Sequence, residues 1–301
     1  MQWTPANRRV VDLWRSECFP IGMDIAGDVS DHDSNDAEDA ISLPSDNDAE
    51  DLMSLPSDID DCEDNGSDSL GSHDVAEVFS PPRVVPVAQS VGLHGKWSLD
   101  LDTGFDLTLE SVQSNMWEIL DTATPKVIVI SPPCTFYSAA NRVWNKGKIP
   151  VDEWERRRGE ANILLHLAMQ VCTYQYHRNA GFVFEHPSGA SSWTDPEVES
   201  VKQLRGVRRV IFDGCVVGHR SKADRWPVKK STALLTNIPE VEAKFTPMKC
   251  RCRRQMIDGK MQKHRVIMGF EGGMSRSRFA QIYPVPMVRL LVAAIHAYVS
   301  H

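Results

Sequence analysis

The chain has 301 residues, of which 42% are hydrophobic, so it can bury a sizeable core and a globular enzyme is permitted. Its formal net charge of -8 averages over two parts of opposite charge. Residues 24–74 hold 18 of the 41 acidic residues and no basic ones, whereas residues 75–301 hold 30 basic residues against 21 acidic ones. Seven scattered cysteines, no leader-like start and no long apolar run argue against a secreted disulfide framework and a membrane-spanning protein, and favour free thiols in a reducing compartment.

The first 74 residues divide into two segments. Residues 1–23 contain a short amphipathic stretch to which the sequence assigns no role. Residues 24–74 consist largely of Asp, Ser and Gly, a composition that cannot offset the entropy of ordering, so we predict that this acidic segment is disordered. Its role stays open between a solvating spacer, a segment regulated by phosphorylation at Ser45 and Ser57, and a DNA mimic that covers a basic domain.

From residue 75 onward, short apolar runs alternate with helical periodicity. The predicted strands are residues 75–79, 97–101, 126–130, 182–185 and 208–212. The predicted helices are residues 84–91, residues 109–120, a long helix that follows Pro150 and stops near Asn179, and residues 285–299. Strand alternating with helix predicts an α/β domain over residues 75–301, with a Rossmann-like parallel sheet and helices on both faces.

Two of the predicted strands end in residues that suit chemistry. One runs into Ser131-Pro-Pro-Cys-Thr-Phe-Tyr-Ser138, where two prolines fix the backbone and hold Cys134 at the strand's end. The other ends in Glu185-His-Pro187. Because ligands of such sheets bind at the carboxyl ends of the strands, we expect the thiol and the carboxylate to face one crevice. This pair suits nucleophilic attack on an electron-poor ring while the acid protonates a ring nitrogen.

The ordered motifs of residues 75–301 resemble those of the DNA cytosine-5 methyltransferases. That family shows Phe-x-Gly-x-Gly, Pro-Pro-Cys, Glu-Asn-Val, Gln-x-Arg-x-Arg and an entry Gly-Asn-x-Val-Pro to a C-terminal helix. The corresponding segments of this chain are Glu77-Val-Phe-Ser-Pro-Pro-Arg83, Pro132-Pro-Cys134, Glu185-His-Pro187, Trp226-Pro-Val-Lys-Lys-Ser-Thr232 and Gln281-Ile-Tyr-Pro-Val-Pro286. The chain is also similar to a divergent group of methyltransferase-like proteins of mobile elements, viruses and some protists, which share the Phe-Ser-Pro-Pro-Arg and Glu-His-Pro variants.

The resemblance implies a class I methyltransferase fold that uses S-adenosylmethionine, and a covalent mechanism. The Cys134 thiolate would add to carbon 6 of a cytosine flipped from DNA while Glu185 stabilises the protonated ring. Carbon 5 would then take the methyl group, and loss of the carbon-5 proton would expel the cysteine. Two plainer interpretations stay open: Cys134 as a small buried residue after a strand, and Glu185 as the cap of a turn.

The resemblance also implies cofactor contacts. Phe79 matches the aromatic residue of the first motif, Asp100 is placed to bind the ribose hydroxyls, and Asp106 the adenine amino group. Pro132 is the fourth residue that we assign to the cofactor site. Either aspartate could instead be an ordinary turn residue.

The first motif departs from the family pattern. Pro81 and Pro82 stand where the family has the glycines that let the backbone approach the cofactor. Three explanations are open: a reshaped cofactor loop, a different nucleotide, or an enzyme that has lost its activity.

Three residues are candidates for substrate binding: Ser138, Arg142 and Lys230. Lys230 stands near the place of a motif arginine, and Arg142 follows the nucleophile loop, where it could contact phosphates together with residues 156–158. Residues 156–158 could equally form a solvated helix face. The resemblance makes residues 232–274 the target-recognition segment, which is short, so we expect low sequence selectivity. We also expect a monomer that binds DNA and no membrane.

The sequence assigns no metal ligand. Cys250-Arg-Cys252 with His264, or Cys215 with His219, would be partial zinc sets, but a paired Cys-x-x-Cys is missing. Two rival functions remain beside the cytosine-5 methyltransferase. One is a nucleic-acid-binding module that kept the fold and lost the reaction, and the other is an amino-methyltransferase, which forms no covalent adduct.

Overall fold

The structure is a computed structural model that describes residues 73–138, 148–222, 224–257, 259–265, 267, 269–271 and 274–301. The predicted disorder of the acidic segment therefore lies almost entirely outside the described residues. Asp74, the last residue of that segment, is described and belongs to the folded domain: it is buried and its carboxylate pairs with Lys126 at 2.8 Å.

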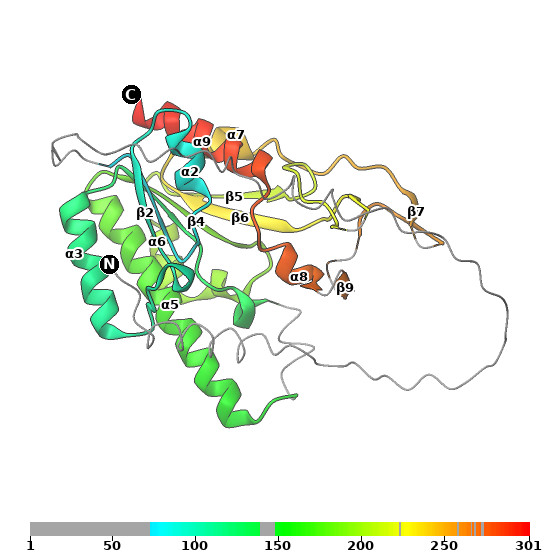
Figure 1. Cartoon of the computed structure of the whole chain (residues 1–301), viewed down its shortest axis with the longest axis horizontal. Helices are drawn as coiled ribbons and strands as arrows, with labels where there is room; N and C mark the ends of the chain where they lie inside the picture. Colours follow the sequence, from blue (N-terminus) through cyan, green and yellow to red (C-terminus); the bar gives the residue numbers. More distant parts are fainter. Residues whose placement is uncertain are drawn as a thin grey trace, which may run out of the picture. The chain divides into compact units, whose positions relative to one another are not determined.

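Six strands form one mixed sheet in the order β2-β1-β3-β4-β6-β5 (Figure 1). The strands β1 to β4 run parallel to one another, and β6 runs antiparallel to both of its neighbours, β4 and β5. Their bounds are Val75–Val78 for β1, Gly95–Leu99 for β2, Val127–Ile130 for β3, Gly181–Pro187 for β4, Arg208–Asp213 for β5 and Ser231–Thr236 for β6.

The expectation of a wholly parallel sheet is wrong at β6. Residues 214–230 connect β5 to β6, and no helix lies in the described part of this connection. A parallel return needs a crossover of a dozen or more residues, usually helical, whereas a chain that turns back directly pairs antiparallel. The first part of the predicted target-recognition segment, residues 232–274, belongs to the core, because it lies in this strand and in helix α7 (Pro239–Phe245), whose Val241 and Phe245 are buried.

Helices cover both faces of the sheet, as predicted (Figure 1). One face carries α2 (Val84–Gln89), α7 and α9 (Val285–Val299), and the other carries α3 (Glu110–Ala123), α5 (Val151–His177) and α6 (Pro196–Lys202).

Strand β3 contributes side chains to the hydrophobic cores on both faces of the sheet. Ile128 and Ile130 belong to the core with α3 and α5, and Val127 and Val129 belong to the core with α9. Alternate residues of a strand point to opposite faces, so a strand buried on both faces needs a continuous apolar run.

The remaining elements are short and lie in the loops. They are the 3-10 turns η2 (Leu101–Thr103), η3 (Thr135–Tyr137) and η4 (Ser191–Thr194), helix α8 (Arg276–Phe279), and the antiparallel pairs β7 (Gln255–Ile257) with β8 (Lys260–Gln262) and β9 (Phe270–Glu271) with β10 (Met274–Ser275). Among the described helices, none is both long enough and apolar enough to cross a lipid bilayer.

The element predictions are confirmed to within a few residues. Helix α9 has the predicted bounds, and β2 begins at Gly95, two residues before the predicted start. The sequence analysis missed β6, α6 and α7. Each has only six or seven residues, which is too short for an apolar periodicity to stand out.

Candidate active site

The sheet has a topological switch point between β1 and β3. From β1 the chain passes to β2 on one side, and later to β3 on the other side. The loops that follow β1 and β3 therefore diverge at the carboxyl edge, and open α/β sheets bind their ligands in such a crevice. The residues after β1 and β3, together with those that end β4, are consequently the candidates for a site.

The loop after β3 presents Cys134. The backbone N–H of Ser131 donates to the carbonyl of Val78 at 3.1 Å, which joins the start of this loop to the end of β1. Pro132 is buried and Cys134 is partly exposed. The carbonyl of Cys134 accepts the N–H groups that close turn η3, including that of Ser138 at 3.1 Å. The Ser138 hydroxyl donates to the backbone at Thr135, so it serves the shape of the loop.

Strand β4 carries Glu185 past the end of β3. The last residue pair of these two strands is Ile130 with Phe184, so Glu185 stands just beyond the neighbouring strand. Lys230 directly precedes β6, and because β6 is antiparallel, its first residues lie at the carboxyl end of β4. The Lys230 ammonium lies 3.4 Å from Glu185 Oε1, and the two side chains are only 10% and 9% exposed. The candidate base-binding lysine is thus the charge partner of the candidate acid.

The charges of Glu185 and Lys230 both act on the Cys134 thiol. Desolvation raises the pKa of Cys134 to about 11, while the positive charge of Lys230 lowers it and the negative charge of Glu185 raises it. The thiol, the carboxylate and the ammonium come from three separate parts of the chain and lie within range of one another's charges. At neutral pH the resting form of Cys134 is the protonated thiol.

Next to Glu185, His186 is fully buried. Its Nδ1 lies 2.6 Å from the Ser192 hydroxyl, and desolvation lowers the pKa of the imidazole to about 3. A neutral histidine in this place fixes the end of β4 and does not serve as an acid or base at neutral pH.

The sequence analysis missed Tyr283 as a site residue. Its hydroxyl lies 2.7 Å from the Ser131 hydroxyl, and the Arg83 guanidinium stands 5.9 Å from its ring centre. Burial raises the pKa of Tyr283, and the charge of Glu185 adds to this effect. A hint was present, because Tyr283 belongs to the motif that leads into the last helix, but nothing in the sequence shows that this segment reaches the end of β3.

In the first motif, Glu77 occupies the start of α2. One carboxylate oxygen accepts the backbone N–H groups of Arg83, Val84 and Val85 at 2.9, 2.7 and 2.8 Å. These N–H groups have no partner within the helix, and Glu77 satisfies three of them at once. Desolvation nevertheless raises the pKa of this buried carboxyl. The N–H groups at the start of α2, directly after the loop with Pro81 and Pro82, are therefore occupied by a side chain of the protein itself.

Two of the predicted cofactor residues follow β1 and β2 directly. Phe79 adopts a left-handed backbone (φ 60°), which a bulky residue rarely does, and its side chain is buried in the core. Asp100 caps turn η2 and accepts the Asp102 N–H at 2.8 Å. Desolvation raises the pKa of Asp100, and the nearby Arg83 charge opposes that rise.

Asp106 lies further from the strand ends. Its carboxylate accepts both the N–H and the hydroxyl of Thr108, at 3.1 and 2.6 Å. This geometry is that of a local turn before α3, which favours the plainer interpretation of Asp106.

The structure bears on only some of the arginines predicted to contact phosphates. Arg142 lies outside the described residues. Arg156 and Arg157 pair with Glu153, Arg156 through Nη2 at 2.8 Å. This supports the solvated helix face for these two arginines.

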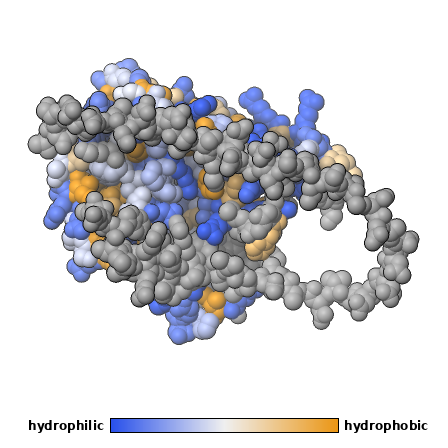
Figure 2. All heavy atoms as spheres, in the orientation of Figure 1, coloured by the Kyte–Doolittle hydropathy of each residue, from blue (hydrophilic) through white to orange (hydrophobic). Residues whose placement is uncertain are grey.

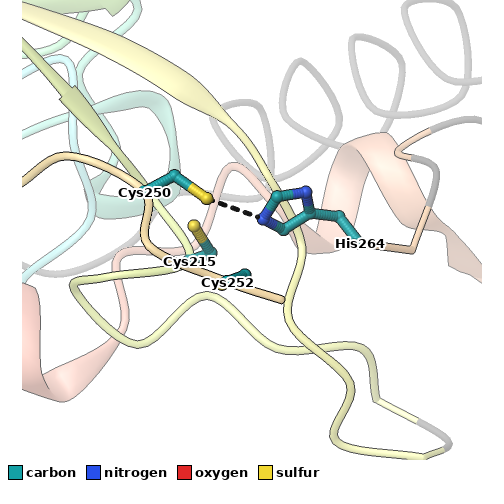
Figure 3. A group of neighbouring side chains, drawn as sticks. All are labelled: Cys215, Cys250, Cys252 and His264. Carbon is teal, nitrogen blue, oxygen red and sulfur yellow. Dashed lines mark hydrogen bonds between the residues drawn. The ribbon is translucent and has the colours of Figure 1, made fainter. Parts of the chain in front are cut away.

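At the same edge of the sheet, in the segments after β5, α7 and β8, the structure gathers four further side chains that could bind a metal: Cys215, Cys250, Cys252 and His264 (Figure 3). The ligand atoms all lie within 4.8 Å of one another. The sequence analysis assigned no metal ligand and considered these residues only as two partial sets. His219, which one of those sets included, is not a member of the group.

Comparison with protein-family models and with curated proteins finds no match for this chain. The chemistry at these strand ends, which we call the crevice after the switch point of the sheet, is that of a protonated thiol near a paired carboxylate and ammonium. Such a group of residues can add sulfur to an electrophilic carbon while polar groups hold the rest of the substrate.

Proposed function

We propose that residues 75–301 form a DNA methyltransferase domain that transfers a methyl group from S-adenosylmethionine to carbon 5 of cytosine. The observation that carries the proposal is that Cys134, in the loop after β3, and Glu185, on the neighbouring strand β4, lie at the same edge of the sheet, with Lys230 paired to Glu185 and both charges acting on the thiol. A thiol alone would be weak support, since free cysteines are commonly buried for packing. A carboxylate–ammonium pair at the same strand ends is harder to explain by packing.

The chain's own residues supply the covalent steps. The Cys134 thiol gives up its proton as its sulfur adds to carbon 6 of an extruded cytosine, and the ring nitrogen takes up a proton that the Glu185 carboxylate stabilises. S-adenosylmethionine supplies an electrophilic methyl group to carbon 5. A base then removes the carbon-5 proton, and the carbon–sulfur bond breaks to release the Cys134 thiolate.

A pKa of about 11 means that Cys134 must be activated for this reaction. Lys230 is the only cation that acts favourably on the thiol among the described residues that affect its pKa. The negative charge of Glu185 opposes ionisation of the Cys134 thiol. When the protonated ring of the substrate base binds to Glu185, the charge of the ring offsets that of the carboxylate. The thiolate is then favoured only with substrate bound, which protects the cysteine from side reactions.

The cap of α2 supports S-adenosylmethionine over a dinucleotide. Nucleotide sites of Rossmann-like sheets place a pyrophosphate at the free N–H groups of the first helix. Here Glu77 occupies those groups, and a second negative charge beside it would be repelled. S-adenosylmethionine has no phosphate, and Asp100, directly after β2, stands at the position from which such sheets bind a ribose.

The raised pKa of Cys134 also gives weight to one rival, an amino-methyltransferase, because that reaction requires no thiolate. A trapping experiment separates the two. DNA that contains 5-fluorocytosine has no carbon-5 proton to lose, so the covalent adduct persists only in the carbon-5 mechanism.

We expect the full chain with S-adenosylmethionine to form a DNA adduct that resists denaturation, and Cys134→Ser to abolish it. Cys172→Ala is the matched control, because Cys172 is a fully buried cysteine in the core that α5 forms with the sheet, and it should still form the adduct. Methylation without an adduct would point to the amino-methyltransferase. Absence of any S-adenosylmethionine binding in a calorimetric titration would leave the inactive binding module.

A further inference from the structure

The four-residue group of Figure 3 is assembled from three segments of the chain. Cys215 lies in the turn after β5, Cys250 and Cys252 follow α7, and His264 follows β8. In Figure 3 the Cys250 sulfur and the His264 ring point toward each other, with the Cys215 sulfur beside them. Three thiols and an imidazole from distant parts of the chain thus converge on one point.

The spacing of the ligand atoms suits a tetrahedral metal ion. With zinc–sulfur bonds of about 2.3 Å and zinc–nitrogen bonds of about 2.0 Å, tetrahedral ligand atoms stand roughly 3.5 to 3.8 Å apart. Here all four ligand atoms lie within 4.8 Å of one another, and Cys250 Sγ is 3.2 Å from His264 Nε2. Small side-chain rotations therefore suffice to close the shell around one ion.

Contacts outside the group hold its segments in place. The Asp213 carboxylate accepts the Cys250 N–H at 2.9 Å, and the Asp213 N–H donates to the Met248 carbonyl at 2.9 Å. On the other side, Arg265 Nε donates to the Asp224 carboxylate at 2.8 Å, which fixes the residue next to His264. The backbone that presents the ligands is therefore positioned by other groups than the ligands themselves.

The hairpin of β7 and β8 exposes the two methionines that its strands pair with each other. Met256 is 62% exposed and Met261 57% exposed, although they face each other across the two strands. An isolated two-stranded hairpin is marginally stable, and small elements without a core commonly depend on a metal ion. A metal ion bound by Cys250, Cys252 and His264 would fasten both ends of this hairpin to the turn after β5.

We propose that Cys215, Cys250, Cys252 and His264 bind one Zn²⁺ ion in a structural site. Three thiols lose their protons to the solvent on binding, the imidazole binds as the neutral form, and four protein ligands complete the shell. Thiolate and imidazole ligands in a tetrahedron select zinc over magnesium, calcium and manganese. The zinc site does not depend on the methyltransferase proposal.

The site fixes a strongly basic segment beside the crevice. Residues 249–265 contain seven Lys and Arg and one acidic residue, and Arg251, Arg253 and Arg254 are exposed. Figure 2 shows hydrophilic side chains protruding at the end of the domain that carries β7. The Gly214 N–H donates to the Lys230 carbonyl at 2.7 Å, so the turn that holds Cys215 touches the segment that holds the active-site lysine.

This arrangement gives the hairpin a function that rests on the proposed one: it contacts DNA phosphates next to the reacting base. Cations on a rigid element neutralise phosphates at a smaller entropic cost than cations on a loose loop. The zinc ion would thus act on DNA affinity through the order of the hairpin, without touching the DNA.

The metal content of the purified full chain tests the zinc site directly. We expect about one zinc per chain by plasma mass spectrometry, as for a four-ligand structural site. Cys252→Ser and His264→Ala should lose most of it. Cys134→Ser and His296→Ala, a thiol and an exposed histidine outside the group, should keep it. A zinc-free wild-type chain after growth with added zinc, or full zinc in both ligand variants, overturns the proposal.

Two further measurements guard against a variant that simply fails to fold. Replacement of zinc by Co²⁺ in the wild-type chain should give the intense thiolate-to-cobalt absorption of a tetrahedral site, and its absence counts against the site. Chelation should speed tryptic cleavage within residues 249–265 while the core remains resistant. A disulfide among Cys215, Cys250 and Cys252 in the protein purified under reducing conditions would also overturn the proposal.

The DNA role has its own test. Arg253→Gln with Arg254→Gln should keep the zinc, weaken DNA binding and reduce its salt dependence by about two phosphate contacts. Unchanged DNA binding would refute the role of the hairpin and leave the zinc site standing. Loss of zinc with unchanged trapping on fluorocytosine DNA would show that the methyltransferase proposal holds without it.

Discussion

The crevice and the zinc group lie at the same edge of the sheet, but they are built in different ways. Cys134, Glu185 and Lys230 stand on or next to strands whose apolar residues are buried on both faces. The ligands of the zinc group stand on loops and beside a hairpin with exposed methionines. The first site is therefore positioned by the hydrophobic core, and the second by hydrogen bonds and by the ion that it is proposed to bind.

Because of this difference, substitutions in the two regions should affect different extents of the molecule. A change under the crevice acts on elements that share the core, so it should alter global stability or the reaction itself. A change at the hairpin should remain local, because loops with few buried contacts open without unfolding the rest. Substitutions in the two regions test whether their effects are independent, and the largest effect is expected at Glu185.

Glu185→Gln removes the carboxylate from the crevice and keeps its size. We expect methyl transfer to fall by about 100-fold to 1000-fold, the range of a lost acid–base group. Single-turnover assays with labelled cofactor measure the change. Zinc content should stay the same, and a parallel loss of zinc would show that the two sites are not independent.

Glu77→Gln removes the charged cap of α2. The free energy of unfolding should fall by about 2 kcal/mol, since the three N–H groups lose a charged acceptor. Urea unfolding followed by circular dichroism measures it, and Glu110→Gln, an exposed acid at the start of α3, is the control. Equal stability of the two variants would contradict the cap.

Lys230→Gln takes away the positive charge near Cys134. Because that charge lowers the pKa of the thiol, its removal should raise the pKa and slow alkylation by iodoacetamide near neutral pH by about tenfold. Lys229→Gln is the matched control, as Lys229 is half exposed and pairs loosely with Asp213 at 3.9 Å. Faster alkylation of the Lys230 variant would contradict the electrostatics proposed for the crevice.

Lowering the pH should reduce the free energy of unfolding of the protein through His186. Its pKa in the folded protein is about 3 against an ordinary value of 6.5, so the unfolded state binds the proton first as the pH falls. Stability is then lost below pH 6.5 and continues to fall toward pH 3. Between about pH 7.5 and about pH 5.5 this amounts to roughly 1 kcal/mol. His186→Gln should show a flatter pH dependence in thermal unfolding, and an unchanged slope would exclude His186 as the cause.

The residues of the crevice were accessible to sequence reasoning because their positions depend on local rules. A run of apolar residues that ends in Pro-Pro-Cys predicts a strand and the rigid loop after it, and the carboxyl ends of parallel strands meet at one edge. Tyr283 escaped this reasoning, because its contact with Ser131 depends on how the last helix packs. The contacts of Asp106 favour the plainer of its two interpretations, since an aspartate before a helix usually serves a turn.

The amino-acid sequence alone suffices to predict the charge contrast between residues 24–74 and the rest, most of the strands and helices, and the positions of Cys134 and Glu185 near the ends of strands. The antiparallel course of β6, the pairing of Lys230 with Glu185, and the assembly of Cys215 with Cys250, Cys252 and His264 become visible only in the folded molecule. The cause is the distance along the chain over which each interaction acts. Periodicity and turn chemistry act over a few residues, whereas these contacts join segments far apart in the chain, which meet only after the sheet has packed.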